Sequence, residues 1–166
     1  MKTMPVLALT IMTALNALAA PEWQGLDDSE WRSGPKLTPE MLKGKVVLVD
    51  KWAMFCPPCR AAMPHLEELW EKYRDKPFVF ISSHCHGDQR DAIAKLVEQH
   101  NLTFSIYNKA GLVGEPSFNA IPFFYLVNPK GEVVYQGLGF SLKTTKELED
   151  AVAAEIAKIT APVSVS

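Results

Sequence analysis

The chain has 166 residues, of which 48% are hydrophobic and 22% are charged, and this size and balance fit one compact globular domain. Lys and Arg total 17 against 19 Asp and Glu, so the net charge of -2 gives no basic surface to attract nucleic acid or an anionic membrane. Three cysteines are too few for a disulfide-stapled mini-protein, and the odd number leaves at least one thiol outside any pair within the chain. The hydrophobic core must therefore hold the fold.

The N-terminal segment, residues 1–19, is typical of a secretory signal peptide. A lysine precedes an apolar run over residues 4–18, and small residues occupy both specificity positions of the terminal Ala17-Leu18-Ala19. The run is too short, and too often broken by polar residues, to reach the roughly 20 apolar residues that span a bilayer. We therefore expect cleavage after Ala19 and a mature domain over residues 20–166. The mature protein would be secreted to the periplasm or another extracytoplasmic space, without stable membrane insertion, and its cysteines would meet oxidising conditions.

The first half of the mature chain predicts a strand, a helix and a second strand. The β-branched run Val46–Trp52 predicts a buried strand, and apolar residues three and four positions apart over Cys59–Arg74 predict a helix. Pro64 lies inside this helix, where we expect a kink and not an end, because proline removes one intrahelical hydrogen bond. Phe78–Ser82 predicts a second buried strand, and the strand–helix–strand order implies a right-handed parallel crossover.

The other segments predict further helices and strands of an α/β fold. We expect, in chain order, an irregular segment over 21–44 with a short helix at 39–42, a helix from a cap at Asp88 to Gln99, a short strand over 102–107, a loop over 109–121, an antiparallel hairpin of strands 123–127 and 132–136, and a last helix over 145–159.

The sequence Cys56-Pro57-Pro58-Cys59 lies between the end of the first predicted strand and the start of the helix that follows it. Backbone amides and the positive end of the helix dipole would face Cys56 there and favour its thiolate. This predicts Cys56 as the nucleophile and Cys59, one turn inside the helix, as the resolving thiol. A zinc site at this motif would need a second ligand pair, which the spacing of the chain does not offer, so we expect no metal at the dithiol. Exchange between thiols and disulfides needs no cofactor, and we expect none.

The residues around this motif resemble the thioredoxin superfamily, specifically its exported TlpA/ResA-like branch. The run Gly44–Ala53 leads into the Cys-Pro-Pro-Cys motif, Pro64 stands eight residues after Cys56, and Ile121-Pro122 precedes the predicted hairpin. The resemblance implies a thioredoxin-like fold with a central mixed β-sheet flanked by helices, and a cis peptide bond at Pro122. The separation of 66 positions between Cys56 and Pro122 leaves room for the helix and strand that this branch inserts before the cis-proline.

The resemblance also implies roles for residues near the cysteines. Asp50 takes the position of a buried acid, where a carboxyl with a desolvation-raised pKa can accept the proton of Cys59. Alternatively, Asp50 is a hydrogen-bonded core residue with no part in turnover. Lys51 stands where an aromatic residue is usual, so this lysine needs a partner or a route to solvent. The residues expected to contact substrate are Trp52, Pro57, Pro58, Ile121 and Pro122, of which the last two would shape a peptide groove.

The third cysteine lies in His84-Cys85-His86, directly after the second predicted strand. Because parallel strands end at the same edge of a sheet, Cys85 is expected near the dithiol. Three interpretations stay open: a partly buried thiol without a role, a thiol that exchanges disulfides with Cys56, and a soft copper or zinc site built from the three residues. In an extended segment the two histidines share one face and Cys85 the other, so a common metal would require a turn at Gly87.

The leading hypothesis is an exported thiol:disulfide oxidoreductase that acts on protein disulfides or dithiols. The resemblance implies a reductase that serves cytochrome c maturation or another assembly pathway and is re-reduced by a membrane electron relay. One alternative is a metal-binding or copper-delivery module that uses His84, Cys85 and His86. Another is a thiol peroxidase.

Overall fold

A computed structural model describes residues 21–161. The predicted signal peptide and the start of the predicted mature domain lie outside the described residues, so both stay predictions. Within residues 21–161, no helix has both the length and the apolar character needed to cross a bilayer. The elements are β1 (Trp23–Gln24), β2 (Trp31–Ser33), α1 (Pro39–Leu42), β3 (Val46–Trp52), α2 (Pro57–Tyr73), β4 (Phe78–His84), α3 (Arg90–His100), β5 (Ser105–Asn108), β6 (Gly111–Leu112), β7 (Phe123–Val127), β8 (Val133–Leu138) and α4 (Leu142–Thr160).

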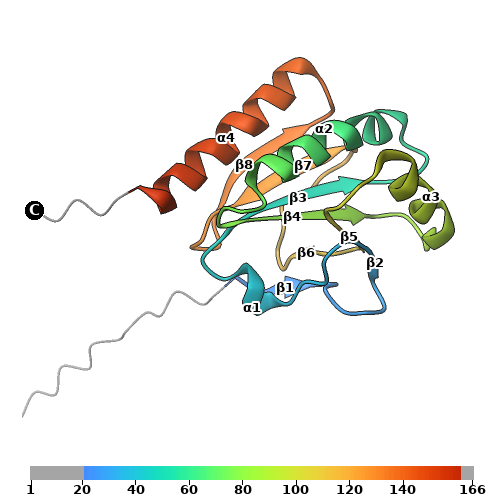
Figure 1. Ribbon diagram of the computed structural model, residues 1–166, viewed down its shortest axis with the longest axis horizontal. Coiled ribbons are helices and arrows are strands. Elements are labelled where there is room, and N and C mark those ends of the chain that lie inside the picture. Colours follow the sequence, from blue (N-terminus) through green and yellow to red (C-terminus); the bar gives the residue numbers. More distant parts are fainter. Residues whose placement is uncertain (1–20, 162–166) are drawn as a thin grey trace, which may run out of the picture.

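A six-stranded mixed sheet in the order β2-β5-β4-β3-β7-β8 forms the centre of the described domain (Figure 1). β3 pairs with β4 in parallel and with β7 in antiparallel orientation, so the predicted crossover and the mixed sheet are confirmed. Every residue of β3 is buried, as a run of β-branched residues in a central strand predicts. The thioredoxin-like α/β fold is thus the observed one, and α3 and β5 lie before Pro122, where the resemblance implies an additional helix and strand.

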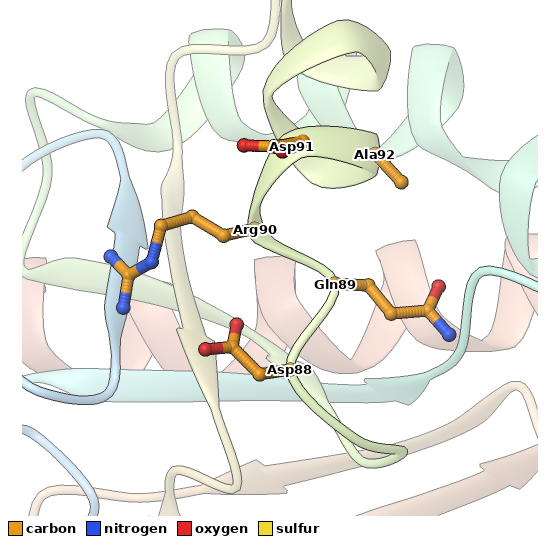
Figure 2. A pocket seen from close by; sticks show the side chains of 5 residues that line it. All are labelled: Asp88, Gln89, Arg90, Asp91 and Ala92. Atoms are coloured by element: carbon orange, nitrogen blue, oxygen red, sulfur yellow. The ribbon is translucent and has the colours of Figure 1, made fainter.

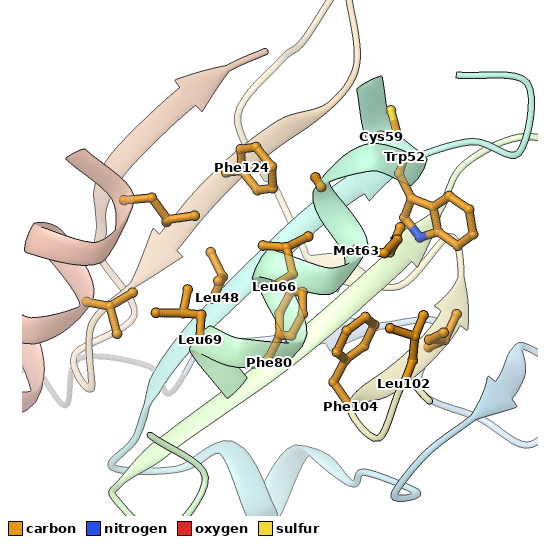
Figure 3. Packing of buried hydrophobic residues seen from close by; sticks show 14 of the residues in the cluster. Leu48, Trp52, Cys59, Met63, Leu66, Leu69, Phe80, Leu102, Phe104 and Phe124 are labelled. Carbon is orange, nitrogen blue, oxygen red and sulfur yellow. The ribbon is translucent and has the colours of Figure 1, made fainter. Parts of the chain in front are cut away.

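Alternate side chains of β3 enter two separate hydrophobic clusters, one on each face of the sheet. Leu48 and Trp52 join the cluster that α2, α3 and α4 cover, while Val47 and Val49 face the side of α1 and the β1–β6 pair. Figure 3 shows the first cluster, in which the α2 side chains pack over the sheet. Trp52 and Cys59 lie together at one end of it, so the core continues directly into the dithiol.

The helices and strands with strong periodicity have nearly the predicted bounds. α1, β3 and β7 match the prediction, and α2 runs without interruption past Pro64 to Tyr73. The short strand begins later than expected, at Ser105, because Leu102 and Phe104 are core residues that precede the ladder. β4 extends two residues further than expected and ends at His84.

Two predictions about loops are wrong. The segment 21–44 contains β1 and β2, and the predicted loop 109–121 contains β6, which pairs with β1 through Trp23 and Leu112. Strands of two or three residues carry no periodicity of their own, because a distant partner defines them.

The start of α3 also differs from its prediction. Gln89, and not Asp88, is the N-cap, and its side chain makes no capping hydrogen bond. Asp88 instead forms an ion pair with Arg32, at 3.3 Å. A surface hollow of about 470 Å³ lies here, lined by residues 88–92, and the Arg90 side chain extends away from the helix toward the neighbouring strand (Figure 2). Arg90 donates to the main-chain oxygens of Trp31 and Ser29, so its charge ties α3 to β2.

Candidate active site

The dithiol lies where the last residues of β3 turn into α2. Cys56 is the N-cap of α2 in an extended conformation, and Cys59 lies in the first turn of the helix. The two sulfurs form a disulfide, with Cα atoms 5.3 Å apart. Two intervening prolines suit this position, because the first helical residues have no intrahelical acceptor for an N–H group. The pair is therefore an oxidised Cys-x-x-Cys centre at the leading end of a helix.

The surroundings of the two sulfurs differ in the way that an attacking and a resolving thiol require. The Cys59 N–H donates to Cys56 Sγ at 3.3 Å, and the first turn of α2 contains no acidic residue. Both features favour negative charge on the Cys56 sulfur, together with the helix dipole. Cys56 is 6% exposed and Cys59 1% exposed, so an incoming disulfide meets Cys56 first.

The loop before β7 lies directly beside the dithiol. The Ile121–Pro122 peptide bond is cis, as the resemblance implies, and the Ile121 carbonyl oxygen lies 3.7 Å from Cys56 Sγ. The Gly139 N–H donates to the Pro122 carbonyl and ties this loop to the end of β8. Ile121 is half-buried and Pro122 is buried, whereas residues 117–120 before them are exposed.

A shallow apolar pocket of about 340 Å³ opens next to the same loop. Phe55 and Phe118 line it together with residues 119–121, and Phe55 is 63% exposed. Sequence reasoning missed both phenylalanines, although an aromatic residue directly before the Cys-x-x-Cys motif is a recognisable feature. Their exposed rings and the exposed Pro57 and Pro58 give an apolar rim beside the disulfide, because Phe55, Pro57 and Pro58 adjoin Cys56 in the chain and the pocket includes Ile121.

Trp52 does not lie on this rim. Its side chain is completely buried and packs against the His84 ring at 5.0 Å between centroids, so the expected contact between Trp52 and a substrate is not compatible with this conformation. Side chains alternate between the two faces of a strand, and Trp52 lies on the same face of β3 as Leu48. Its ring is therefore directed into the core beneath α2.

Asp50 is a buried acid in β3, on the sheet face that α2 covers. Its Oδ2 accepts a 3.4 Å hydrogen bond from Ser82, while Oδ1 has no hydrogen-bond partner among residues 21–161. Burial raises the pKa of Asp50 to about 8, which outweighs the lowering effects of the Ser82 hydrogen bond and the Lys51 charge. A carboxyl with such a pKa can take up or release a proton near neutral pH.

Lys51 points to the opposite face of the sheet and forms an ion pair with Glu115 there. Its ammonium lies 2.7 Å from a Glu115 carboxylate oxygen and donates to the Ala110 carbonyl at 2.8 Å. The Tyr125 hydroxyl donates to the same Glu115 oxygen at 2.6 Å. The buried lysine is therefore neutralised by a residue 64 positions later in the chain, on the segment between β6 and β7.

The three residues of His84-Cys85-His86 point in different directions. His84 is completely buried, and its burial lowers its pKa. Cys85 is half-buried, its N–H and its sulfur both contact the Trp52 carbonyl oxygen, and burial raises its pKa. His86 is exposed and packs edge-on against Phe55. Within residues 21–161, no group of three histidine, cysteine or acidic side chains is placed to hold a metal ion.

Comparisons with known proteins agree with this geometry. A Redoxin family profile matches residues 32–154. Protein SUPPRESSOR OF QUENCHING 1, chloroplastic, of Arabidopsis thaliana is 34% identical over 121 residues, and thiol-disulfide oxidoreductase ResA of Bacillus thuringiensis (strain Al Hakam) is 32% identical over 117 residues. Each match covers 69% of this chain, but it spans 11% of the Arabidopsis protein and 66% of ResA.

Solved structures extend the likeness at the level of the fold. A thiol-disulfide isomerase from Corynebacterium glutamicum superposes with a TM-score of 0.64 over 77% of this chain and 91% of its own. Its sequence identity is 21%, so this likeness concerns the fold alone.

Proposed function

The chain belongs to the Redoxin family, within the TlpA/ResA-like branch of the thioredoxin superfamily, and we propose that it is an exported thiol:disulfide oxidoreductase that acts on protein substrates. One observation carries this proposal. The Cys56–Cys59 disulfide caps the leading end of α2, with a backbone N–H on the Cys56 sulfur and with Cys59 held deeper in the core. This is the arrangement that dithiol exchange requires.

The exchange uses both sulfurs and one proton acceptor. In the reduced enzyme, the Cys56 thiolate attacks one sulfur of a substrate disulfide, so a mixed disulfide forms and the other substrate sulfur leaves as a thiolate. Cys59 then gives its proton to the ionised form of Asp50 and attacks the Cys56 sulfur. This step forms the Cys56–Cys59 disulfide and releases the second substrate thiolate. Two electrons pass from the enzyme to the substrate, and the same steps in reverse would oxidise a dithiol.

The substrate approaches across the rim formed by the loop before β7 and the prolines of the motif. In this proposal Ile121 and Pro122 present a backbone edge to an extended peptide, and exposed Pro57 and Pro58 border it. The apolar pocket at Phe55 and Phe118 would take an adjoining hydrophobic side chain.

The direction of electron flow, the compartment and the partners belong to the same proposal. We propose a reductase in the periplasm or another extracytoplasmic space, as the resemblance to the exported branch and the segment 1–19 suggest. It would serve cytochrome c maturation or another assembly pathway and would be re-reduced by a membrane electron relay. A reductase has a dithiol with a low reduction potential. In a glutathione mixture that leaves the dithiol of a weaker reductant reduced, the dithiol of this protein must therefore become oxidised.

Catalysed reduction of a protein disulfide tests the proposal, with insulin as the probe and dithiothreitol as the electron source. Cys56→Ser should abolish the catalysed rate, whereas Cys59→Ser should accumulate a mixed disulfide with the probe. Cys85→Ser is the matched control and should keep the rate. An unchanged rate in Cys56→Ser would overturn the proposal. Peroxide consumption by the same sample tests the thiol peroxidase alternative. Its metal content tests the alternative of a metal-binding module.

A further inference from the structure

We propose that His84 is a positioning residue for the dithiol, which holds the turn before Cys56 by accepting a hydrogen bond from the Met54 N–H. The inference rests on the proposed function, because it concerns how the same site is kept in shape. It requires His84 to act through the backbone and not to touch substrate.

The hydrogen bonds of the ring define its chemical state. The Met54 N–H lies 3.3 Å from Nε2 of His84, and Nδ1 lies 3.1 Å from the Asn108 side-chain oxygen. A backbone N–H can only donate, so Nε2 must be the unprotonated nitrogen that accepts. The proton of the neutral ring therefore sits on Nδ1 and is donated to Asn108. Both ring nitrogens are occupied, which leaves no free lone pair for proton transfer to a substrate or for a metal.

The ring has little freedom to move. His84 ends β4, pairs in register with Trp52 on β3 and Asn108 on β5, and is completely buried. The indole of Trp52 meets it at 74°, and the Lys109 N–H donates to the His84 carbonyl at 2.8 Å. The Asn108 N–H in turn donates to the Glu30 carbonyl at 2.7 Å. Three neighbouring strands thus fix the position of Nε2.

The turn that depends on this contact carries the nucleophile. Residues 53–56 connect β3 to α2, and within this turn the Cys56 N–H donates to the Ala53 carbonyl at 3.1 Å. The hydrogen bond from the Met54 N–H to His84 attaches this turn to the end of β4 in the sheet. Without an acceptor at this point, the partly buried Met54 N–H would be left unsatisfied, and its peptide plane would rotate to find another acceptor. Such a rotation would move the Cys56 sulfur relative to the amides of α2.

The loss of this contact should therefore appear in the reactivity of Cys56. His84→Phe keeps an aromatic ring but removes the acceptor, and His84→Gln offers an amide oxygen in its place. In reduced protein with Cys85→Ser, His84→Phe should lower the iodoacetamide rate of Cys56 near neutral pH by about 3- to 10-fold and shift its pH profile upward. His84→Gln should restore most of the rate, and His100→Phe, a control on α3, should leave both unchanged.

Two results would overturn the inference. One is a folded His84→Phe protein with the wild-type pH profile of Cys56. The other is a His84→Gln protein that reacts as slowly as His84→Phe. If His84→Phe does not fold, nitrogen NMR of the wild-type ring still decides, because a proton found on Nε2 in neutral protein would exclude the Met54 contact. These readouts do not depend on protein-disulfide reduction, so a failure of the proposed function is distinguishable from a failure of this inference.

Discussion

Replacing Asp50 by asparagine should stabilise the oxidised protein in neutral and alkaline solution and leave its stability in acid nearly unchanged. Asp50 is buried in β3, where Ser82 donates to one carboxyl oxygen and the other oxygen has no hydrogen-bond partner among residues 21–161. Ionisation there leaves a negative charge in the core. Asparagine has almost the same size and does not ionise, so the substitution removes this cost and little else.

The magnitude follows from the pKa of Asp50 in the two states. Burial raises it from the ordinary value of 3.8 to about 8 in the folded protein. Between these two values the carboxyl is ionised in the unfolded chain and protonated in the folded one, so the folded state binds more protons. The free energy of unfolding therefore falls as pH rises through this window and levels off above it. At that plateau the cost amounts to roughly 6 kcal/mol, and below pH 3.8 it vanishes because both states are protonated.

Urea unfolding of the two oxidised proteins across this pH range measures the effect. The difference in the free energy of unfolding should be close to zero in acid and should grow in favour of Asp50→Asn until the pH passes about 8. Asp75→Asn, at an exposed position after α2, is the control and should show no such trend. Parallel stability curves for wild type and Asp50→Asn at every pH would refute the raised pKa of Asp50.

Three further predictions concern other parts of the site. Lys51→Met should lower the free energy of unfolding by about 2 to 3 kcal/mol in urea titrations, because Glu115 keeps a largely buried charge without its partner; Glu115→Gln in the same protein should recover part of the loss. Phe118→Ala should raise KM for hydrophobic peptide disulfides severalfold with little change in kcat, since it removes a wall of the pocket; a kcat effect alone would speak against a binding role. In reduced protein, mass mapping should find Cys85 alkylated far more slowly than Cys56, because burial raises the Cys85 pKa, and equal rates would contradict this.

The centre of the fold was predictable from sequence because adjacent residues there carry the signals for each strand, turn and helix. Val46–Trp52 is rich in β-branched valine, lies after a glycine and leads into two prolines and two cysteines, so strand, turn and helix follow in order. β1, β2 and β6 were not predictable, since each has only two or three residues and is defined by pairing with a strand far away in the chain. Trp23 of β1, for example, pairs with Leu112 of β6. Asp88 was misread as a cap because its ion pair with Arg32 depends on tertiary structure.

The candidate site divides in the same way. The position of the dithiol follows from adjacent residues, whereas the partner of Lys51 does not, because Glu115 reaches it only through the path of the segment between β6 and β7. The hydrogen bond from Met54 to His84 likewise joins the turn after β3 to the end of β4, 30 positions later in the chain. Trp52 was expected to contact substrate, although the alternation of side chains along β3 directs it into the core.

Redox titration of the Cys56–Cys59 pair in glutathione mixtures tests the central claim most directly. Protein with Cys85→Ser should show one reversible two-electron transition, and the transition should disappear when Cys56 is also replaced by serine. A pair that stays oxidised or reduced across all mixtures of glutathione and stronger dithiols, or a transition that survives the loss of Cys56, would contradict an exchanging dithiol at the start of α2.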